Sequence, residues 1–404
     1  MVIGAGHAGL AMSYQLQQAG IEHVVLDAGD IGQRWRSERW DSLRLLTPNW
    51  MLDLPGFRYA GQDPDGYMHK DSVADHLVSY ASFMSAPLKR YSRVHRLWNE
   101  GEVYRVQTTQ GLWQARAVVM ATGAFAKPLQ SPLEQSLPDG VVQLTTNLYK
   151  RPTDVPTQRI MVVGGSATGL QFAQELNQAG HEVTLSVGEH VRMPRRVAGH
   201  DIYHWLTKSG VFWEQAGEVD DLRRARRLPS PQLIGQQQDL NLNELSAAGV
   251  DIVGRFVGVS DGKAQFSGNL PNLCKSADLK LFRLLQRFKT SGLAFDEAEL
   301  NFAPTEIPKP RLSMRFGASG VGTILWATGY RPDYSWVDMD VCDNKGLLQH
   351  QEGVVRPGLY ALGLPLMRSR ASTFIAGVRD DTSAIACHVA AHLDSRKQLL
   401  ATAF

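Results

Sequence analysis

The sequence predicts an α/β protein with two parallel-sheet domains of similar design, the second inserted into the first. Three observations predict this. A short apolar segment enters a glycine triplet at residues 4–9, and the same order of strand, turn and helix recurs from residue 159. A buried segment ending in Ala-Thr-Gly follows each copy, at 117–123 and 322–329. Such internal repetition is typical of paired Rossmann-like nucleotide-binding domains.

The length of 404 residues exceeds what one hydrophobic core accommodates, which favours two domains. We expect residues 1–152 and 317–404 to form the first domain, because the segment 322–330 is expected to return to it. Residues 153–316 form the predicted second domain, with a helical and hairpin insertion at about 204–316. That insertion is interpreted either as a lid or substrate wall, or as an addition without a role in the site.

The first repeat is expected to bind a dinucleotide. Gly4 permits a tight turn, Gly6 lets the backbone approach a pyrophosphate, and Gly9 lets the helix pack on the strand. The free amides at the helix start favour phosphate. Asp27 ends the next strand, where a carboxylate can accept hydrogen bonds from ribose hydroxyls. The alternative is a glycine-rich turn in an ordinary parallel-sheet protein.

Residues 32–48 form a predicted loop that is rich in Trp and Arg. Its rings would contact an aromatic cofactor and its guanidiniums the phosphates. The alternative is a surface loop that packs on its own domain. After it we expect a helix near 71–84, an antiparallel hairpin at 93–98 and 103–109, and the buried strand 117–123.

The second repeat differs from the first at two positions. Ser166 replaces the middle glycine, and Ser186 stands where the first repeat has Asp27. Without that carboxylate a 2′-phosphate is not repelled, and three arginines follow at 192, 195 and 196. We therefore predict NADP(H) rather than NAD(H). The arginines come late in the segment, so another role for them stays open.

The rest of the chain gives fewer signals. A hairpin is expected at 250–259 and 262–266, a helix at 277–288, a strand within 357–365 and a final helix at 381–393, after Asp380. Cys387, His388 and His392 lie on that helix without a completing carboxylate, so no metal site is expected.

Composition narrows the class of protein. Apolar residues make up 43% and charged residues 20%, as in soluble enzymes, and a net charge of +2 gives no reason to expect a nucleic-acid or membrane partner. The three cysteines form neither a disulfide framework, a zinc spacing nor a C-x-x-C dithiol, which suits the cytoplasm. We expect no signal peptide, and no apolar run reaches the ~18 residues that span a bilayer.

The two fingerprints, each followed by an Ala-Thr-Gly strand, and the Gly-x-x-Trp-Arg…Trp-Asp-Ser-Leu-Arg-Leu loop after the first carry a family resemblance. The chain resembles the flavin-containing monooxygenases. It is most similar to the bacterial single-component (class B) flavoproteins related to them and to the Baeyer–Villiger monooxygenases. The resemblance covers residues 1 to about 200 well and 320–380 moderately.

The resemblance implies FAD at the first fingerprint and NADPH at the second. Gly4, Gly6, Gly9 and Asp27, with the segment 33–46, would hold FAD, and Gly164, Ser166 and Gly169, with Arg192 or its neighbours, would hold NADPH. The full set of expected cofactor contacts is Gly4, Ala5, Gly6, His7, Ala8, Gly9, Asp27, Gln33, Arg34, Trp35, Trp40, Leu46, Thr47, Val94, Ala121, Thr122, Gly123, Gly164, Ser166, Ala167, Thr168, Gly169, Ser186, Arg192, Arg195, Arg196, Ala327, Thr328, Gly329, Gly363 and Asp380. Asn49 corresponds to an asparagine beside the flavin's reactive carbon and is the implied catalytic residue.

The chain departs from the family in one motif. The family has Phe-x-Gly-x-x-x-His-x-x-x-aromatic before its second nucleotide unit, whereas residues 140–149 contain neither Phe nor His. Leu144 or Thr145 occupies the histidine position, and only Gly140 and Tyr149 persist. That histidine is linked with coupling NADPH oxidation to oxygen transfer, so its absence puts efficient monooxygenation in doubt.

The function implied is an NADPH-reduced monooxygenase that forms a flavin hydroperoxide and oxygenates nitrogen, sulfur or a ketone of a small molecule. Substrate and molecular oxygen are then its partners, and a homodimer stays open. An FAD-dependent dehydrogenase or reductase with another acceptor keeps both cofactors and fits the missing histidine. A third interpretation is a redox-sensing binding protein without turnover.

Overall fold

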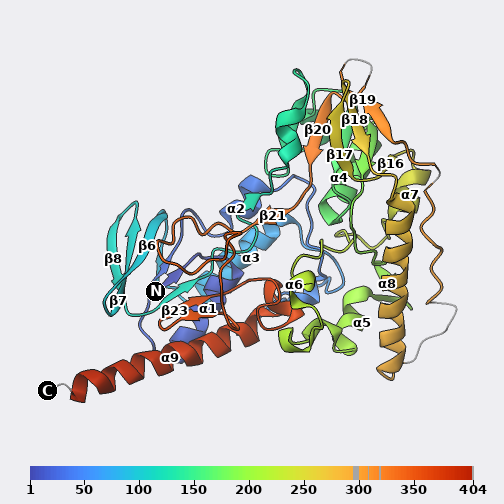
Figure 1. Cartoon of the computed structure of the whole chain (residues 1–404). Helices are drawn as coiled ribbons and strands as arrows, with labels where there is room; N and C mark the ends of the chain where they lie inside the picture. Colours follow the sequence, from blue (N-terminus) through green and yellow to red (C-terminus); the bar gives the residue numbers. More distant parts are fainter. Residues whose placement is uncertain (294–299, 308, 318–319, 403–404) are drawn as a thin grey trace.

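The computed structural model describes residues 1–293, 300–307, 309–317 and 320–402 of the chain. Two parallel sheets organise it, one near the N-terminus and one at the opposite end of the molecule (Figure 1). The predicted α/β class, with two dinucleotide-type domains, is confirmed by the order of the strands in both sheets. In this part of the chain no helix is both long and apolar enough to cross a membrane.

The first sheet has the order β22-β23-β9-β1-β2-β5 and is parallel apart from β22. Its strands are β1 (Val2–Ile3), β2 (Val25–Leu26), β5 (Leu88–Lys89), β9 (Val118–Met120), β22 (Val354–Arg356) and β23 (Leu359–Ala361). The second sheet has the order β11-β20-β12-β13-β16 and is wholly parallel. Its strands are β11 (Val142–Thr145), β12 (Arg159–Val163), β13 (Glu182–Ser186), β16 (Asp251–Val253) and β20 (Thr323–Trp326).

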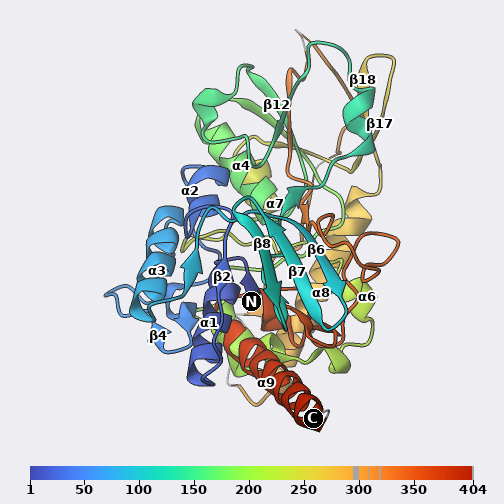
Figure 2. The same cartoon turned by 90° about the vertical axis from the view of Figure 1, so that its left-hand side faces the viewer.

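Smaller antiparallel sheets flank these two. A three-stranded sheet attached to the first domain faces the viewer in Figure 2. It comprises β6 (Val94–Glu100), β7 (Val103–Thr108) and β8 (Gly111–Ala115). A second one comprises β17 (Phe256–Ser260), β18 (Lys263–Phe266) and β19 (Ser313–Arg315). The two-stranded pairs are β3 (Asp53–Leu54) with β4 (Phe57–Arg58), β10 (Lys127–Pro128) with β21 (Tyr330–Arg331), and β14 (Arg196–Val197) with β15 (His200–Asp201).

Helices cover the sheets and connect them. The α-helices are α1 (His7–Gln18), α2 (Gln33–Glu38), α3 (Lys70–Phe83), α4 (Ala167–Gln178), α5 (Ile202–Lys208), α6 (Leu222–Ala225), α7 (Leu242–Ala247), α8 (Leu270–Thr290) and α9 (Val378–Thr402). Short 3-10 turns are η1 (Asn49–Met51), η2 (Pro132–Ser136), η3 (Pro152–Asp154), η4 (Val211–Trp213), η5 (Ala216–Glu218) and η7 (Arg370–Thr373). The end of α9 projects from the body of the protein (Figure 1).

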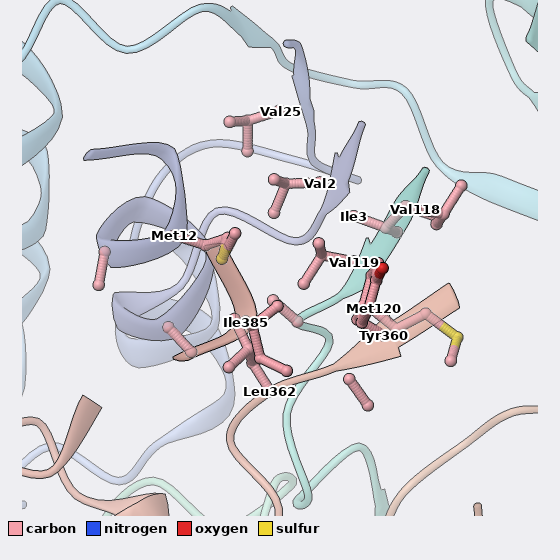
Figure 3. Close-up of a cluster of buried hydrophobic side chains, with 14 of the residues drawn as sticks. Val2, Ile3, Met12, Val25, Val118, Val119, Met120, Tyr360, Leu362 and Ile385 are labelled. Atoms are coloured by element: carbon pink, nitrogen blue, oxygen red, sulfur yellow. The ribbon is translucent and has the colours of Figure 1, made fainter. Parts of the chain in front are cut away.

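Apolar side chains from distant parts of the sequence form the core of the first domain. Val2, Val25 and Val119 are at most 2% exposed and lie on neighbouring strands of the sheet. Met12 from α1 and Ile385 from α9 pack against them (Figure 3). The C-terminal helix therefore completes a core that begins at the second residue of the chain.

The domain boundaries differ from those expected. Strand β20 does not return to the first sheet, because it pairs in parallel with β11 and β12 of the second. The β11 strand, which precedes the expected boundary at residue 152, lies in the second sheet as well. The chain thus enters the second sheet earlier than expected and re-enters the first domain after residue 326. Strand pairing over such a separation has no local sequence signal.

The insertion also differs in detail. The expected strand 250–259 is two strands: β16 joins the parallel sheet, and β17 turns away to pair with β18. Both α8 and α9 begin earlier and end later than expected, whereas α3 and the β6–β7 hairpin are confirmed. Residues 294–299 and 308 of the segment 204–316, and residues 403–404 of the expected first domain, lie outside the described residues.

Candidate functional site

The first glycine turn brings strand and helix into direct backbone contact. Gly4 has a φ of +106°, in the region that favours glycine. A Cβ atom on Gly9 would lie 1.8 Å from the carbonyl oxygen of Gly4, so only glycine lets α1 approach β1 this closely. A Cβ on Gly6 would meet no protein atom within 4 Å. The helix start therefore faces open space at Gly6, which fits a bound pyrophosphate.

Asp27 stabilises this turn while facing the ligand side of the sheet. Its Oδ2 accepts a hydrogen bond of 2.6 Å from the amide of Ala5, and its Oδ1 accepts one of 2.9 Å from the amide of Gly29. Each carboxylate oxygen can accept a second bond, so a ribose hydroxyl can still be held. The amide of Ser92, just before β6 and Val94, donates to the Asp27 carbonyl.

His7 is the first residue of α1, and it is partly buried. Burial lowers the pKa of His7 to about 4, so the ring is neutral at pH 7. Its Nε2 is buried and has no hydrogen-bond partner within the described chain. A neutral, unpartnered ring nitrogen at the helix start is consistent with the predicted cofactor contact.

The second turn repeats this geometry. Gly164 has a φ of +127°, and a Cβ on Gly169 would lie 1.7 Å from the carbonyl oxygen of Gly164. Ser166 caps α4 through its backbone alone, since its hydroxyl makes no capping bond. Ala327–Gly329 follow β20 beside this turn, as Ala121–Gly123 follow β9 beside the first. Both predicted fingerprints therefore have the backbone that a dinucleotide requires.

A cavity of about 610 Å³ lies in front of the second turn. Gly164, Ser166 and Thr168 form one wall, and Leu46 and Trp35 from the segment after the first turn form another. Further aromatic rings line it: Phe125, Phe256, Trp326 and Tyr330. A ligand bound at the second turn would thus contact the segment that follows the first.

A polar group in this cavity combines Arg39, an arginine of the predicted segment 32–48, with Tyr330 and Thr146, which the sequence did not single out. The guanidinium of Arg39 lies over the rings of Trp35 and Tyr330, at 5.9 and 5.3 Å from their centroids, and donates to the Tyr330 hydroxyl at 3.2 Å. The Tyr330 hydroxyl also bonds the Thr146 hydroxyl. Thr146 adjoins the position of the missing histidine in the sequence, and it lines the cavity together with Arg39 and Tyr330. The signals in the sequence were the segment 32–48, which is rich in Trp and Arg, and the Ala-Thr-Gly-Tyr ending of the second buried strand.

The three arginines that were expected at a 2′-phosphate bond instead to other groups of the protein. Arg192 is 8% exposed, pairs with Asp278 at 2.6 Å and donates to the Ala303 carbonyl. Arg195 is 2% exposed and pairs with Asp201 at 2.8 Å. Arg196 bonds Gln237 and the Gly199 carbonyl. None of the three lines the cavity, so the geometry does not support the expectation that they bind the phosphate.

Ser186 lines the cavity, but its hydroxyl is already bonded to the backbone. It is buried, donates to the Gly254 carbonyl at 3.0 Å and accepts from the Phe256 amide at 2.9 Å. The hydroxyl therefore holds a neighbouring turn.

The segment after the first turn is less free than expected, because part of it is helix α2. Gln33 accepts from the amide of Asp30, at the start of α2. Arg34 pairs with Glu38 at 2.8 Å and also donates to the carbonyl of Phe125. Their side chains thus hold the protein together, and a direct phosphate contact by Arg34 is not supported.

Trp40 joins the two domains. It is 4% exposed, and its ring lies edge-on to Phe172 of α4, with centroids 4.8 Å apart. Tyr149, the aromatic residue of the altered motif, packs on the other side of Phe172 at 4.6 Å. Trp40 therefore packs into the core of the second domain, and it also lines the cavity, as Leu46 does.

Asn49 begins η1 and has one open hydrogen-bonding atom. Its Nδ2 donates to the Asp63 carbonyl at 2.8 Å, which fixes the amide plane. Its Oδ1 is buried without a partner in the described chain. Thr47, two residues earlier, is half-buried. An oriented amide with one unpaired oxygen fits the predicted position beside a cofactor.

Helix α9 begins three residues before the expected position. Asp380 is exposed in its first turn, whereas Asp381 is 2% exposed. Gly363, with a φ of +74°, approaches Ala8 of α1. Gly363 therefore lies beside the start of α1, and the buried carboxylate in the first turn of α9 is Asp381, not the expected Asp380. No cluster of three metal-ligating side chains occurs among the described residues.

Replacing Asp381 with asparagine is expected to stabilise the protein at pH 8. Burial raises the pKa of Asp381 to about 6, against the lowering effects of Ser372 and Arg368. Because the native carboxyl titrates above its ordinary value of 3.8, its ionisation opposes folding as the pH rises from 4 to 6 and beyond. We expect a gain of about 1–3 kcal/mol at pH 8 that vanishes near pH 4, measured by urea unfolding. The exposed neighbour variant Asp380→Asn should show no such gain, and an equal effect of both would contradict this.

Comparison with known proteins shows the family to which the chain belongs. Residues 1–207 match the family model described as pyridine nucleotide-disulphide oxidoreductase. An uncharacterized CzcO-like oxidoreductase of Geobacillus kaustophilus is 33% identical over 94% of this chain and 95% of that protein. Indole-3-pyruvate monooxygenase YUCCA8 of Oryza sativa is 25% identical over 88% and 80%. A flavin-containing monooxygenase structure from Stenotrophomonas maltophilia has a TM-score of 0.67 at 22% identity, over 97% and 98% of the chains.

Proposed function

Because the chain belongs to the pyridine nucleotide-disulphide oxidoreductase family, as a flavoprotein similar to the flavin monooxygenases, we propose that it is an NADPH-dependent monooxygenase acting on a small organic molecule. One observation carries the proposal. A single aromatic cavity is lined by both the second nucleotide turn and the segment that follows the first. A nucleotide bound at the second turn is thereby directed towards the first, as electron transfer between two cofactors requires.

The cofactors are FAD and NADP(H), and the residues present fit them. When bound, FAD supplies the reaction with oxygen and NADPH supplies the hydride. The amides at the start of α1 and the Asp27 carboxylate would hold the first nucleotide, and the amides at the start of α4 would hold the second. Neutral His7 adds no charge to the flavin side.

In the proposal, Arg39 binds an anionic group of the ligand and Tyr330 helps to exclude water from the cavity. The guanidinium lies over two rings, donates to the Tyr330 hydroxyl and has further hydrogen-bond donors for a phosphate or a carboxylate. The ring of Tyr330 and the indoles around it exclude water from the same space. The Asn49 amide, fixed by Asp63, presents its Oδ1 to a hydrogen-bond donor of the cofactor or substrate.

The second candidate is an NADPH dehydrogenase or reductase with another electron acceptor. The absence of the family's histidine from residues 140–149 favours it. A dithiol relay is disfavoured, because the cysteines at 274, 342 and 387 are free and none is near another in the sequence. The two candidates differ in the fate of molecular oxygen. A monooxygenase transfers one of its atoms to the substrate, whereas a dehydrogenase or reductase does not.

The test measures oxygenated product and hydrogen peroxide for each NADPH oxidised, with an amine, a sulfide and a ketone as substrates. A monooxygenase should yield close to one product molecule per NADPH for one of these classes. Peroxide from every class, with rapid reduction of a quinone, would instead support the reductase. A colourless protein that takes up no flavin would exclude both.

Asn49→Ala is expected to lower the product formed per NADPH by about 10- to 100-fold while flavin content stays normal. The reason is that it removes the only side-chain oxygen of η1 that is buried and unpaired. Asn99→Ala is the matched control, because Asn99 also donates to one carbonyl, at 3.2 Å, in the β6–β7 hairpin. Unchanged coupling in Asn49→Ala would remove this residue from the site.

A further inference from the structure

A tight turn between β16 and β17 faces the second nucleotide turn. Its residues are Gly254, Arg255 and Phe256. The Ser186 hydroxyl at the end of β13 donates to the Gly254 carbonyl and accepts from the Phe256 amide, at 3.0 and 2.9 Å. Both bonds are buried, and they hold the residues on either side of Arg255. One hydroxyl therefore fixes the backbone from which Arg255 projects.

The Arg255 side chain lies at the cavity and is free to bind a ligand. It lines the same wall as Gly164 and Ser166, and it is exposed. Within the part of the chain that the structure describes, its guanidinium has no hydrogen bond and no ion pair. A Cβ on Gly188 would lie 3.0 Å from the Arg255 Nε. Because Gly188 has no side chain, the Arg255 side chain can pass beside it without a steric clash.

We propose that Arg255 binds the 2′-phosphate of NADPH and that Ser186 is its positioning residue. This rests on the proposed function, in which NADPH is the electron donor. In nucleotide-binding units of this type the end of the second strand meets the adenosine ribose. Here the end of β13 carries the Ser186 hydroxyl, which bonds to backbone groups. In this proposal the Arg255 guanidinium, which Ser186 positions, contacts the ribose phosphate in place of the acid of an NAD-binding unit. A guanidinium can donate two parallel hydrogen bonds to a phosphate.

The cavity holds one group that would oppose this assignment. Glu189 lines the same wall, and a carboxylate there could bind the ribose diol of NADH instead. Its Oε1 lies 3.4 Å from the Nζ of Lys280 on α8, so its charge is partly balanced by a lysine. Arg255 has no such partner among the described residues and is the better anion ligand.

The test is calorimetric titration of the FAD-loaded full chain with 2′,5′-ADP and with 5′-AMP, which needs no turnover. The wild type should bind 2′,5′-ADP at least about 10-fold more tightly than 5′-AMP. Arg255→Gln should weaken 2′,5′-ADP by about 10- to 100-fold and leave 5′-AMP unchanged. Arg255→Lys should recover part of the loss, since it restores charge but not the two parallel donors.

Ser186→Ala should weaken 2′,5′-ADP in the same direction by a smaller factor, and Ser186→Thr, which keeps the hydroxyl, should restore it. Because Arg255 is exposed, its variants are expected to fold. They therefore test the proposal even if Ser186→Ala does not fold. Arg196→Gln, also an exposed arginine, is the matched control and should change neither affinity.

Three results would overturn the assignment: equal binding of both ligands by the wild type, unchanged 2′,5′-ADP binding in Arg255→Gln, or loss of it in Arg196→Gln. Stronger binding of 5′-AMP that is lost in Glu189→Gln would indicate an NADH site. A protein that binds 2′,5′-ADP through Arg255 but releases only peroxide would keep this inference while the monooxygenase proposal fails.

Discussion

Replacing Gly6 with alanine is expected to leave the protein folded and to remove its FAD. Gly6 has a φ of −76°, which any L-residue can adopt, and its new methyl group would meet no protein atom within 4 Å. The methyl group would instead enter the space in front of the α1 amides, where the pyrophosphate is proposed to bind. We expect FAD affinity to fall by at least about 100-fold, because several amide–phosphate hydrogen bonds are lost together.

The measurement compares flavin absorbance of the purified variant with its far-ultraviolet circular dichroism and its urea midpoint. Gly217→Ala is the matched control, because Gly217 also has open space around it and a φ outside the left-handed region. Gly9→Ala should behave in the opposite way and lose structure, since its methyl group would lie 1.8 Å from the Gly4 carbonyl oxygen. Full flavin content in Gly6→Ala would refute the assignment of this turn.

Replacing Arg195 with methionine is expected to destabilise the protein by about 3–5 kcal/mol without changing the preference for NADPH over NADH. The guanidinium pairs with Asp201 at 2.8 Å, donates to the Leu46 carbonyl and lies over the ring of Tyr67. Asp201 in turn accepts from the Tyr67 hydroxyl at 2.7 Å. Without Arg195 the buried Asp201 carboxylate loses its charge partner, and the contact to the Leu46 carbonyl in the first domain is lost.

Urea unfolding and the ratio of Michaelis constants for NADPH and NADH separate the two possible roles. The double variant Arg195→Met/Asp201→Leu should recover part of the stability, because no charge is then left unpaired. Arg196→Gln should stay within about 0.5 kcal/mol of the wild type, as is usual for a surface substitution. A stable Arg195→Met protein that discriminates poorly against NADH would instead place the arginine at the nucleotide.

The repeated nucleotide units could be predicted because their signals are local. Gly4 and Gly9 lie within one turn, and the constraint that joins them is a backbone contact across that turn. The same applies to Gly164 and Gly169. Alternating and apolar segments similarly marked α3 and the β6–β7 hairpin. Helix α2 was missed, because a run rich in Trp, Arg and Ser has little apolar periodicity.

The arginines illustrate the opposite case. Arg192 and Arg195 follow β13 closely in the sequence, yet their partners Asp278 and Asp201 turn them away from the cavity. Arg255 comes more than sixty residues after Ser186 in the sequence, and only the pairing of β13 with β16 brings the two together. Neighbourhood along the chain was therefore a poor guide to which cation meets a ligand.

By itself, the sequence determined the α/β class, the two nucleotide turns and the identity of the acid after the first. Tertiary structure alone decided which sheet receives β20, how Trp40 joins the domains and which arginine at the cavity has no hydrogen bond or ion pair from its side chain to another described residue. The physical reason is the range of the forces involved. A glycine turn is set by sterics within a few residues, whereas strand pairing and the neutralisation of a buried charge depend on groups that come together only when the chain folds.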